Sequence, residues 1–123
     1  MLAWGMDGKT SAVTAEHYAW GDGCDGWHLL RAADLSVIEE RMPAGAKEER
    51  HRHWQVRQMF YVLEGELSME LEGEVVVLRK NEALEIAPGR AHQAMNRSGG
   101  EVRFLVVSSP PTRGADGLDR EPA

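Results

Sequence analysis

Hydrophobic and polar residues alternate along much of the chain between positions 27 and 108. The clearest case is segment 67–71, LSMEL, which has the two-residue period of a strand with one buried face. Turn residues such as those at 64–65, 72–73 and 88–89 separate the segments. The predicted strands are 27–32, 35–42, 51–58, 59–63, 67–71, 75–78, 84–87, 92–96 and 102–107. Many short strands with regularly spaced turns predict an all-β protein, a closed barrel or jelly roll.

The two ends of the chain lack this alternation. Residues 1–26 are rich in glycine and carry Trp4, Tyr18 and Trp20, so we predict a partly extended arm that packs on its own barrel or on a neighbouring subunit. Residues 109–123 contain several prolines and glycines, which predicts an irregular tail. The expected organisation is therefore an arm (1–26), a barrel (27–108) and a tail (109–123).

Composition narrows the function classes. A chain of 123 residues holds one hydrophobic core, and its formal net charge of −6 argues against nucleic-acid binding. No apolar run approaches the length of a signal peptide or a membrane span, so we expect a cytoplasmic protein without membrane partners. Cys24 is the single cysteine, which rules out an intramolecular disulfide and a cysteine-based zinc cluster.

The histidines carry the most informative chemistry. His51 and His53 are two residues apart, so on an extended strand their side chains point to the same face. Imidazole is the commonest metal ligand among side chains, and two on one face form half of a coordination shell. Gln58 could return an amide oxygen to the same point if the chain bends before it, and His92 could complete the group from another strand.

The spacing of these residues resembles the first motif of the cupin superfamily. That motif is a glycine, five residues, His-x-His, three or four residues, a glutamate, six residues and a glycine. The chain has Gly45, five residues, His51-Arg52-His53, four residues, Gln58, six residues and Gly65. All spacings match, and the one departure is the amide at 58 in place of the carboxylate.

A second stretch resembles the other cupin motif, which is a glycine, five residues, Pro-x-Gly, two residues, a histidine, three residues and an asparagine. The chain has Asn81, five residues, Ala87-Pro88-Gly89, two residues, His92, three residues and Asn96. Asn81 and Ala87 depart from the pattern. The resemblance covers 45–96 by motif and about 27–108 with flanking strands, and it is greatest to small single-domain bacterial cupins.

The resemblance implies a double-stranded β-helix, the cupin jelly-roll barrel, that holds one divalent metal ion per chain. His51, His53 and His92 would be its ligands, with Gln58 at the fourth position. Three imidazoles suit zinc, nickel, iron, manganese or copper. An amide leaves the full charge of the ion for a bound water or anion, but Gln58 cannot act as a general base.

Strand parity indicates further pocket residues. Phe60 and Val62 share a face with Gln58, while Ala94 and Asn96 share a face with His92, so all four are candidates to line the interior. Ordinary core packing is the alternative for Phe60. Arg41 is a candidate to reach an anionic substrate, with a surface ion pair as the alternative.

Two functions follow from these candidates. The first is a metal-dependent enzyme, of oxygenase, isomerase or lyase type, that acts on a small and anionic organic molecule. The second is a non-catalytic protein that binds or senses such a molecule, favoured by the missing glutamate and by the lack of an evident acid–base partner beside the metal. Small cupins usually pair, so we expect a homodimer.

Overall fold

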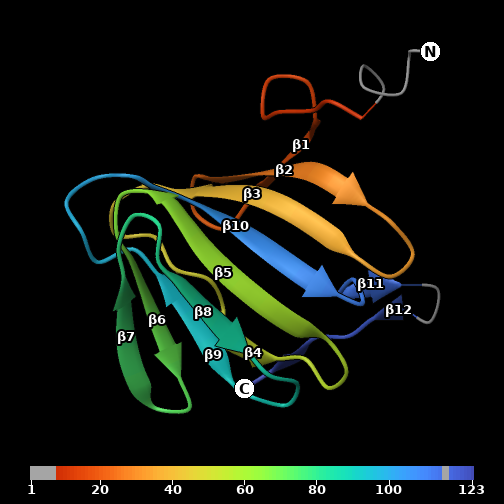
Figure 1. Ribbon diagram of the computed structural model, residues 1–123. Helices are drawn as coiled ribbons and strands as arrows, with labels where there is room; N and C mark the ends of the chain where they lie inside the picture. Colours follow the sequence, from red (N-terminus) through yellow and green to blue (C-terminus); the bar gives the residue numbers. More distant parts are fainter. Residues whose placement is uncertain (1–7, 115–116) are drawn as a thin grey trace.

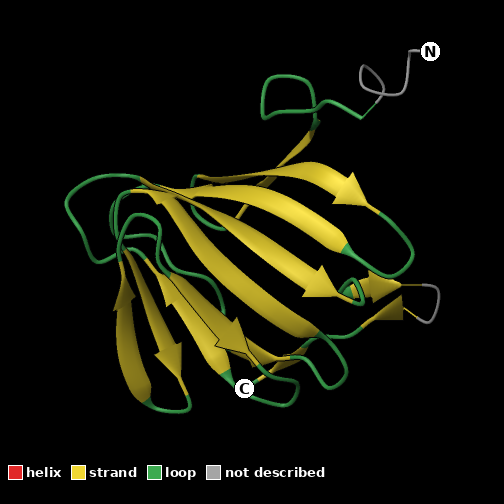
Figure 2. Ribbon diagram, viewed as in Figure 1, coloured by secondary structure: helices red, strands yellow, loops and turns green. Residues whose placement is uncertain are grey.

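The computed structural model describes residues 8–114 and 117–123. Within these residues the chain forms strands and loops arranged as two antiparallel sheets that face each other (Figures 1 and 2). This confirms the predicted all-β jelly-roll barrel. No helix in the described residues is long and apolar enough to cross a membrane.

The larger sheet has the strand order β1-β2-β3-β10-β5-β8 and the smaller one the order β13-β4-β9-β6-β7. The larger sheet consists of β1 (Glu16–Trp20), β2 (Cys24–Arg31), β3 (Ser36–Met42), β10 (Val102–Ser109), β5 (Arg57–Glu64) and β8 (Ala83–Ile86). The smaller sheet consists of β13 (Glu121–Pro122), β4 (His51–Arg52), β9 (His92–Met95), β6 (Leu67–Leu71) and β7 (Glu74–Leu78). A separate pair joins β11 (Arg113–Gly114) to β12 (Gly117–Leu118).

The core lies between the two sheets, where alternate residues of each strand point inward. Strand β10 shows this most regularly, because Val102, Phe104, Val106 and Ser108 are buried and the residues between them are partly exposed. The rings of Phe104 and Phe60 meet with centroids 5.9 Å apart. The predicted alternation of buried and exposed residues therefore holds along this central strand.

Glycines close two of the predicted turns. Glu72 and Gly73, both with positive φ, join β6 to β7, which confirms the hairpin predicted there. Gly65 follows β5 with φ +85, and a Cβ at this position would lie 2.5 Å from the backbone oxygen of Glu101. Gly65 therefore serves both the turn and the close approach of the strand-connecting loop that leads into β10.

Both ends of the chain contribute short strands. The stretch we assigned to an arm contributes β1 and the start of β2, which extend the larger sheet, and the predicted tail contributes β11, β12 and β13. Pro122 lies at the sheet edge on β13, where its missing N–H is tolerated. Tyr18 and Trp20 pack on the chain's own barrel, whereas Trp4 lies outside the described residues.

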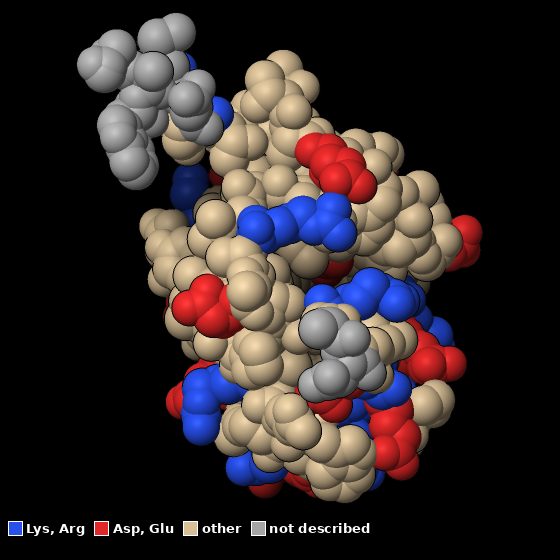
Figure 3. All heavy atoms as spheres, turned by 90° about the vertical axis from the view of Figure 1, so that its right-hand side faces the viewer, with Lys and Arg blue, Asp and Glu red and all other residues tan. Residues whose placement is uncertain are grey.

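Charges of both signs are interspersed on the face that Figure 3 shows. Several oppositely charged side chains form ion pairs, including Arg31 with Glu16 and Arg103 with Glu39.

Candidate metal centre

Three histidines meet inside the barrel. His51 of β4 lies directly opposite His92 of β9 in the sheet register, and His53 follows the end of β4. One ring nitrogen from each of the three lies within 4.8 Å of the other two, and their residues are 3%, 4% and 0% exposed for His51, His53 and His92. The structure thus brings the three predicted imidazoles together.

Each imidazole is held in one orientation through its Nδ1 atom. His51 Nδ1 lies 2.7 Å from the carbonyl oxygen of Glu49, His53 Nδ1 lies 2.5 Å from that of Asp119, and His92 Nδ1 lies 2.9 Å from that of Arg90. A carbonyl accepts only, so each Nδ1 carries the proton and each Nε2 keeps a free lone pair. This tautomer is the one that metal-binding histidines adopt.

Two of these lone pairs have nothing to bind within the described residues. The Nε2 atoms of His53 and His92 are buried without a hydrogen-bond partner, an arrangement that costs free energy unless a further group occupies the centre. Burial lowers the pKa of all three imidazoles, that of His51 to about 3, although the carbonyl contacts oppose the shift. The rings are therefore neutral at physiological pH, as a metal requires.

Gln58 approaches the same centre from the opposite sheet. The stretch 51–58 is not one strand: β4 ends at Arg52, the chain turns through 53–56, and β5 begins at Arg57 in the larger sheet. Gln58 Nε2 donates to Ser108 Oγ at 3.0 Å, while its Oε1 is buried without a partner. The bend proposed before Gln58 thus exists, and Gln58 Oε1 is a third unpartnered atom that fits the donor set of a divalent ion.

A cavity of about 180 Å³ opens beside the histidines. Gln58 and Phe60 line it together with His51, and Phe60 also belongs to the hydrophobic core. The other lining residues come from strands β1, β3 and β10 and from the loops that surround them: Tyr18, Trp20, Ile38, Glu40, Glu48, Val106, Ser108, Thr112 and Arg120.

Two carboxyl groups in this cavity were missed from the sequence. Glu40 Oε2 accepts a hydrogen bond of 2.9 Å from the Tyr18 hydroxyl, and Glu48 Oε2 accepts one of 2.8 Å from the backbone N–H of Ala94. Burial raises the pKa of Glu40 to about 7 and that of Glu48 to about 8. The alternation of side chains along the strand could have indicated that Glu40 faces inward, because its neighbours Glu39 and Arg41 face outward. Glu48 lies in a loop, where no such alternation exists.

The remaining candidates lie outside the cavity. Arg41 points to the outer face of β3, where it pairs with Asp25 at 3.1 Å and Glu101 at 3.1 Å, so the surface ion pair replaces the predicted substrate contact. The parity of Arg41 is that of the solvent face, opposite to Met42 and Glu40.

Val62, Ala94 and Asn96 are buried but do not line the cavity either. Val62 and Ala94 belong to the hydrophobic core. Asn96 Nδ2 donates to the carbonyl oxygens of Met42 and Gly100 at 3.0 and 2.8 Å, which anchors the loop after β9. Val62 and Ala94 thus serve packing, whereas Asn96 serves the conformation of a loop.

A family model for the cupin domain matches residues 38–108. The chain belongs to the cupin family. Its match spans β3 to β10 and therefore includes all three histidines and Gln58.

Individual relatives of this cupin are distant. An uncharacterised protein of Methanocaldococcus jannaschii is 27% identical over 84 residues, which is 68% of this chain and 67% of that protein. The structure of KdgF from Halomonas sp. superposes with a TM-score of 0.76 at 22% identity, covering 82% of this chain and 91% of the other. A cupin described as a sugar phosphate isomerase, from Silicibacter pomeroyi, gives 0.76 at 20% identity and covers 93% and 92%. At these identities the structures share the fold.

Proposed function

We propose that this cupin is a metal-dependent enzyme that acts on a small, anionic organic molecule. The observation that carries the proposal is the set of buried, unpartnered donor atoms, His53 Nε2, His92 Nε2 and Gln58 Oε1, beside His51. Such atoms are costly to bury, and one divalent ion would satisfy them together.

The donor set supports a divalent ion of the borderline group. Three neutral imidazoles and an amide oxygen suit zinc, nickel, iron, manganese or copper, and they leave the ion's charge of two uncompensated. When bound, such an ion polarises an oxygen of the substrate as a Lewis acid. The uncompensated charge favours an anionic partner in the adjoining cavity.

The carboxyls in the cavity favour catalysis over simple binding. The sequence offered no acid–base partner beside the histidines, which supported a non-catalytic role. Glu40 and Glu48 now lie in the same cavity as His51, and burial brings the pKa of Glu40 to about 7. A carboxyl group with a pKa near the working pH is the type that enzymes use to move protons.

Elemental analysis of the protein, purified without an immobilised-metal column, tests the proposal. We expect about one divalent ion per chain in the wild type and loss of that ion in His51→Ala and His92→Ala. His17→Ala is the matched control, because His17 is exposed and its ring binds Asp25 at 2.7 Å instead. Metal content that survives both site substitutions would contradict the metal centre.

The reaction type is tested separately. Oxygen consumption with enol and catechol substrates would identify an oxygenase, whereas turnover without oxygen uptake would favour an isomerase or a lyase. A metal-loaded protein that binds small acids and turns none of them over would support the binding role instead.

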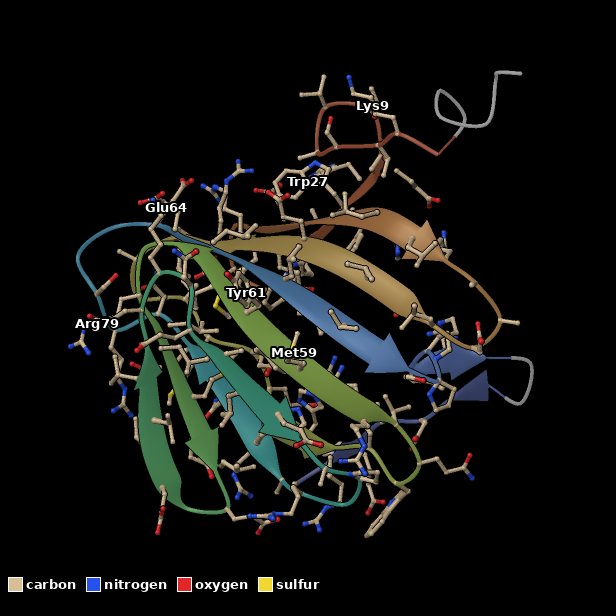
Figure 4. The ribbon with its side chains drawn as sticks, in the orientation of Figure 1. Lys9, Trp27, Met59, Tyr61, Glu64 and Arg79 are labelled. Carbon is tan, nitrogen blue, oxygen red and sulfur yellow. The ribbon has the colours of Figure 1, made fainter. Side chains whose placement is uncertain are left out.

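Pairing of two chains remains a prediction. The outer face of the larger sheet supports it, since Met59 and Tyr61 of β5 and Trp27 of β2 carry apolar surface there (Figure 4). Met59 is 39% exposed and Leu30 is 43% exposed. Light scattering at micromolar concentration should give the mass of a dimer, and a monomer would refute it.

A further inference from the structure

Arg120 brings an unpaired positive charge to the cavity. The residue comes from the segment between β12 and β13, and its guanidinium lines the cavity beside His51. Within residues 8–114 and 117–123, no carboxylate lies within 4 Å of it. Most of the other arginines pair directly with a carboxylate, whereas Arg120 acts on Glu40 and Glu48 only by an electrostatic attraction, which opposes the rise of their pKa values.

The nearest side-chain contact of Arg120 does not satisfy its donors. Its Nη2 atom lies 3.3 Å from His51 Nδ1, but that nitrogen already donates its proton to the carbonyl of Glu49 at 2.7 Å. Two N–H donors that face each other form no hydrogen bond, so the guanidinium remains free to bind an acceptor. Arginine presents two parallel N–H groups that match the geometry of a carboxylate.

Of the two carboxyl groups that line the cavity, that of Glu40 is held by a side-chain hydrogen bond. Its Oε2 is fixed by the Tyr18 hydroxyl at 2.9 Å, and its side chain lines the same cavity as Arg120. The cavity has one other carboxyl group, that of Glu48, which accepts a hydrogen bond of 2.8 Å from the backbone N–H of Ala94. Its remaining charged or titratable side chains are Tyr18, His51 and Arg120. Glu40 is therefore both oriented and accessible from the cavity.

We propose that the cavity binds a small oxo acid whose carboxylate is held by Arg120, and that Glu40 transfers a proton on the carbon next to the carbonyl group of that acid. The inference rests on the proposed function, because the metal is what would polarise the carbonyl oxygen of the acid. It adds the chemical class of the substrate and assigns a residue to each of the two remaining tasks. The apolar side chains of Ile38, Phe60 and Val106 would enclose the carbon skeleton.

The proposed step conserves atoms and electrons. Glu40, as the carboxylate, takes the proton of the C–H bond next to the carbonyl; the C–H electron pair forms a carbon–carbon double bond, and the carbonyl pair moves onto oxygen. Return of the proton from Glu40 to a carbon of the same molecule restores the carboxylate. Burial places the pKa of Glu40 at about 7, so both of its protonation states are accessible near neutral pH.

Binding is tested with pyruvate as the anionic probe and pyruvamide as its neutral counterpart, by calorimetry on the protein as purified. We expect pyruvate to bind and pyruvamide to bind at least tenfold more weakly. Arg120→Gln should lower the affinity for pyruvate about tenfold or more, since it removes a charge-assisted contact. Arg113→Gln is the matched control, because Arg113 lies on β11, near the same end of the chain, and does not line this cavity.

Proton transfer is tested by NMR in D₂O, as deuterium exchange into the methyl group of pyruvate. The wild type should catalyse the exchange, and Glu40→Gln should slow it about a hundredfold while it still binds pyruvate. Glu39→Gln is the control, since the neighbouring Glu39 lies on the outer face and binds Arg103. Tyr18→Phe is a second variant that leaves the carboxylate in place without its hydrogen bond, and we expect an intermediate rate.

The outcomes separate this inference from the function on which it rests. Equal affinity for pyruvate and pyruvamide, or an unchanged affinity in Arg120→Gln, would overturn the anion site. Exchange that is undiminished in Glu40→Gln, or not detected in the wild type, would overturn the role of Glu40. If metal content measured on the same samples is retained in each of these cases, the metal centre stands and the further inference alone fails.

Discussion

Asp119, in the C-terminal segment, contacts the candidate metal centre, and substituting this residue tests how the site is held. The Asp119 carboxylate accepts the backbone N–H groups of Trp54 and Gln55 at 2.8 Å each and that of Val56 at 3.1 Å. Its backbone carbonyl accepts the Nδ1 proton of His53. One residue of the last strand region therefore fixes the loop that follows His53 and also the ring of His53.

The cost of Asp119→Ala follows from these bonds. Trp54 and Gln55 are exposed, so their N–H groups regain water and each bond contributes about 0.5–1.5 kcal/mol to the free energy of unfolding. Val56 is 1% exposed, so leaving its N–H without an acceptor costs about 1–3 kcal/mol. We expect a total loss of about 3 kcal/mol, and roughly half of that for Asp119→Asn, which keeps one acceptor oxygen.

The pKa of Asp119 determines how the contribution of its carboxylate to the free energy of unfolding depends on pH. Burial acts to raise the pKa of Asp119, but the three N–H donors outweigh it and the net pKa is lowered. A carboxyl whose pKa is lower in the folded state stabilises the fold above its ordinary pKa, and this contribution is lost as the pH falls through the folded value. The difference between wild type and Asp119→Ala should therefore be full near pH 7 and shrink on acidification.

Urea denaturation of the metal-free proteins measures the stability, and a metal titration measures the effect on the site. Freeing the segment also loosens the carbonyl that orients His53, so we expect metal affinity to fall about tenfold or more. Glu121→Gln is the matched control, since the amide oxygen can still accept the indole N–H of Trp54. If Asp119→Ala unfolds like the wild type and binds metal as tightly, this account of the segment is wrong.

Three further predictions address the site and the fold. Gln58→Glu should bind the metal more tightly, because a carboxylate offsets one unit of the ion's charge. Ser108 Oγ, which accepts from the Gln58 amide, can donate its own proton to the new carboxylate. Calorimetry that gives equal or weaker affinity would count against the charge argument. Gly65→Ala should destabilise the fold by about 2–3 kcal/mol in urea denaturation. Gly73 has a similar positive φ but no atom within 4 Å of an added Cβ, so Gly73→Ala should cost only about 1 kcal/mol. Equal losses would show that the contact with Glu101 does not cause the larger cost at Gly65. Burial raises the pKa of Glu40 from 4.5 to about 7, so unfolding releases a proton between these pH values. The wild type should therefore lose stability relative to Glu40→Gln as the pH rises from about 4.5 to 7. Parallel profiles of stability against pH for the two proteins would refute this.

Much of the fold was predictable because its signals are local. The period of two in segment 67–71 and the turn residues at 72–73 specify a hairpin within about ten residues of chain, and the structure forms it as β6 and β7. The boundaries at the ends were not predictable in the same way. The short strands β1 and β13 exist because edges of the two sheets are available to pair with them, and no local pattern in the sequence reports that an edge is free.

The candidate metal centre shows the same division. The spacing within each of two short motifs is a local property of the chain, and the resemblance of these motifs to those of cupins predicted the three histidines and Gln58 as one group. Only the tertiary structure decided that Tyr18, Glu40 and Arg120 share a cavity with His51. These residues lie on segments far apart in sequence, and the register between strands and the path of the last segment bring them together. Long-range packing sets both, so the chemistry around the histidines is a property of the folded barrel.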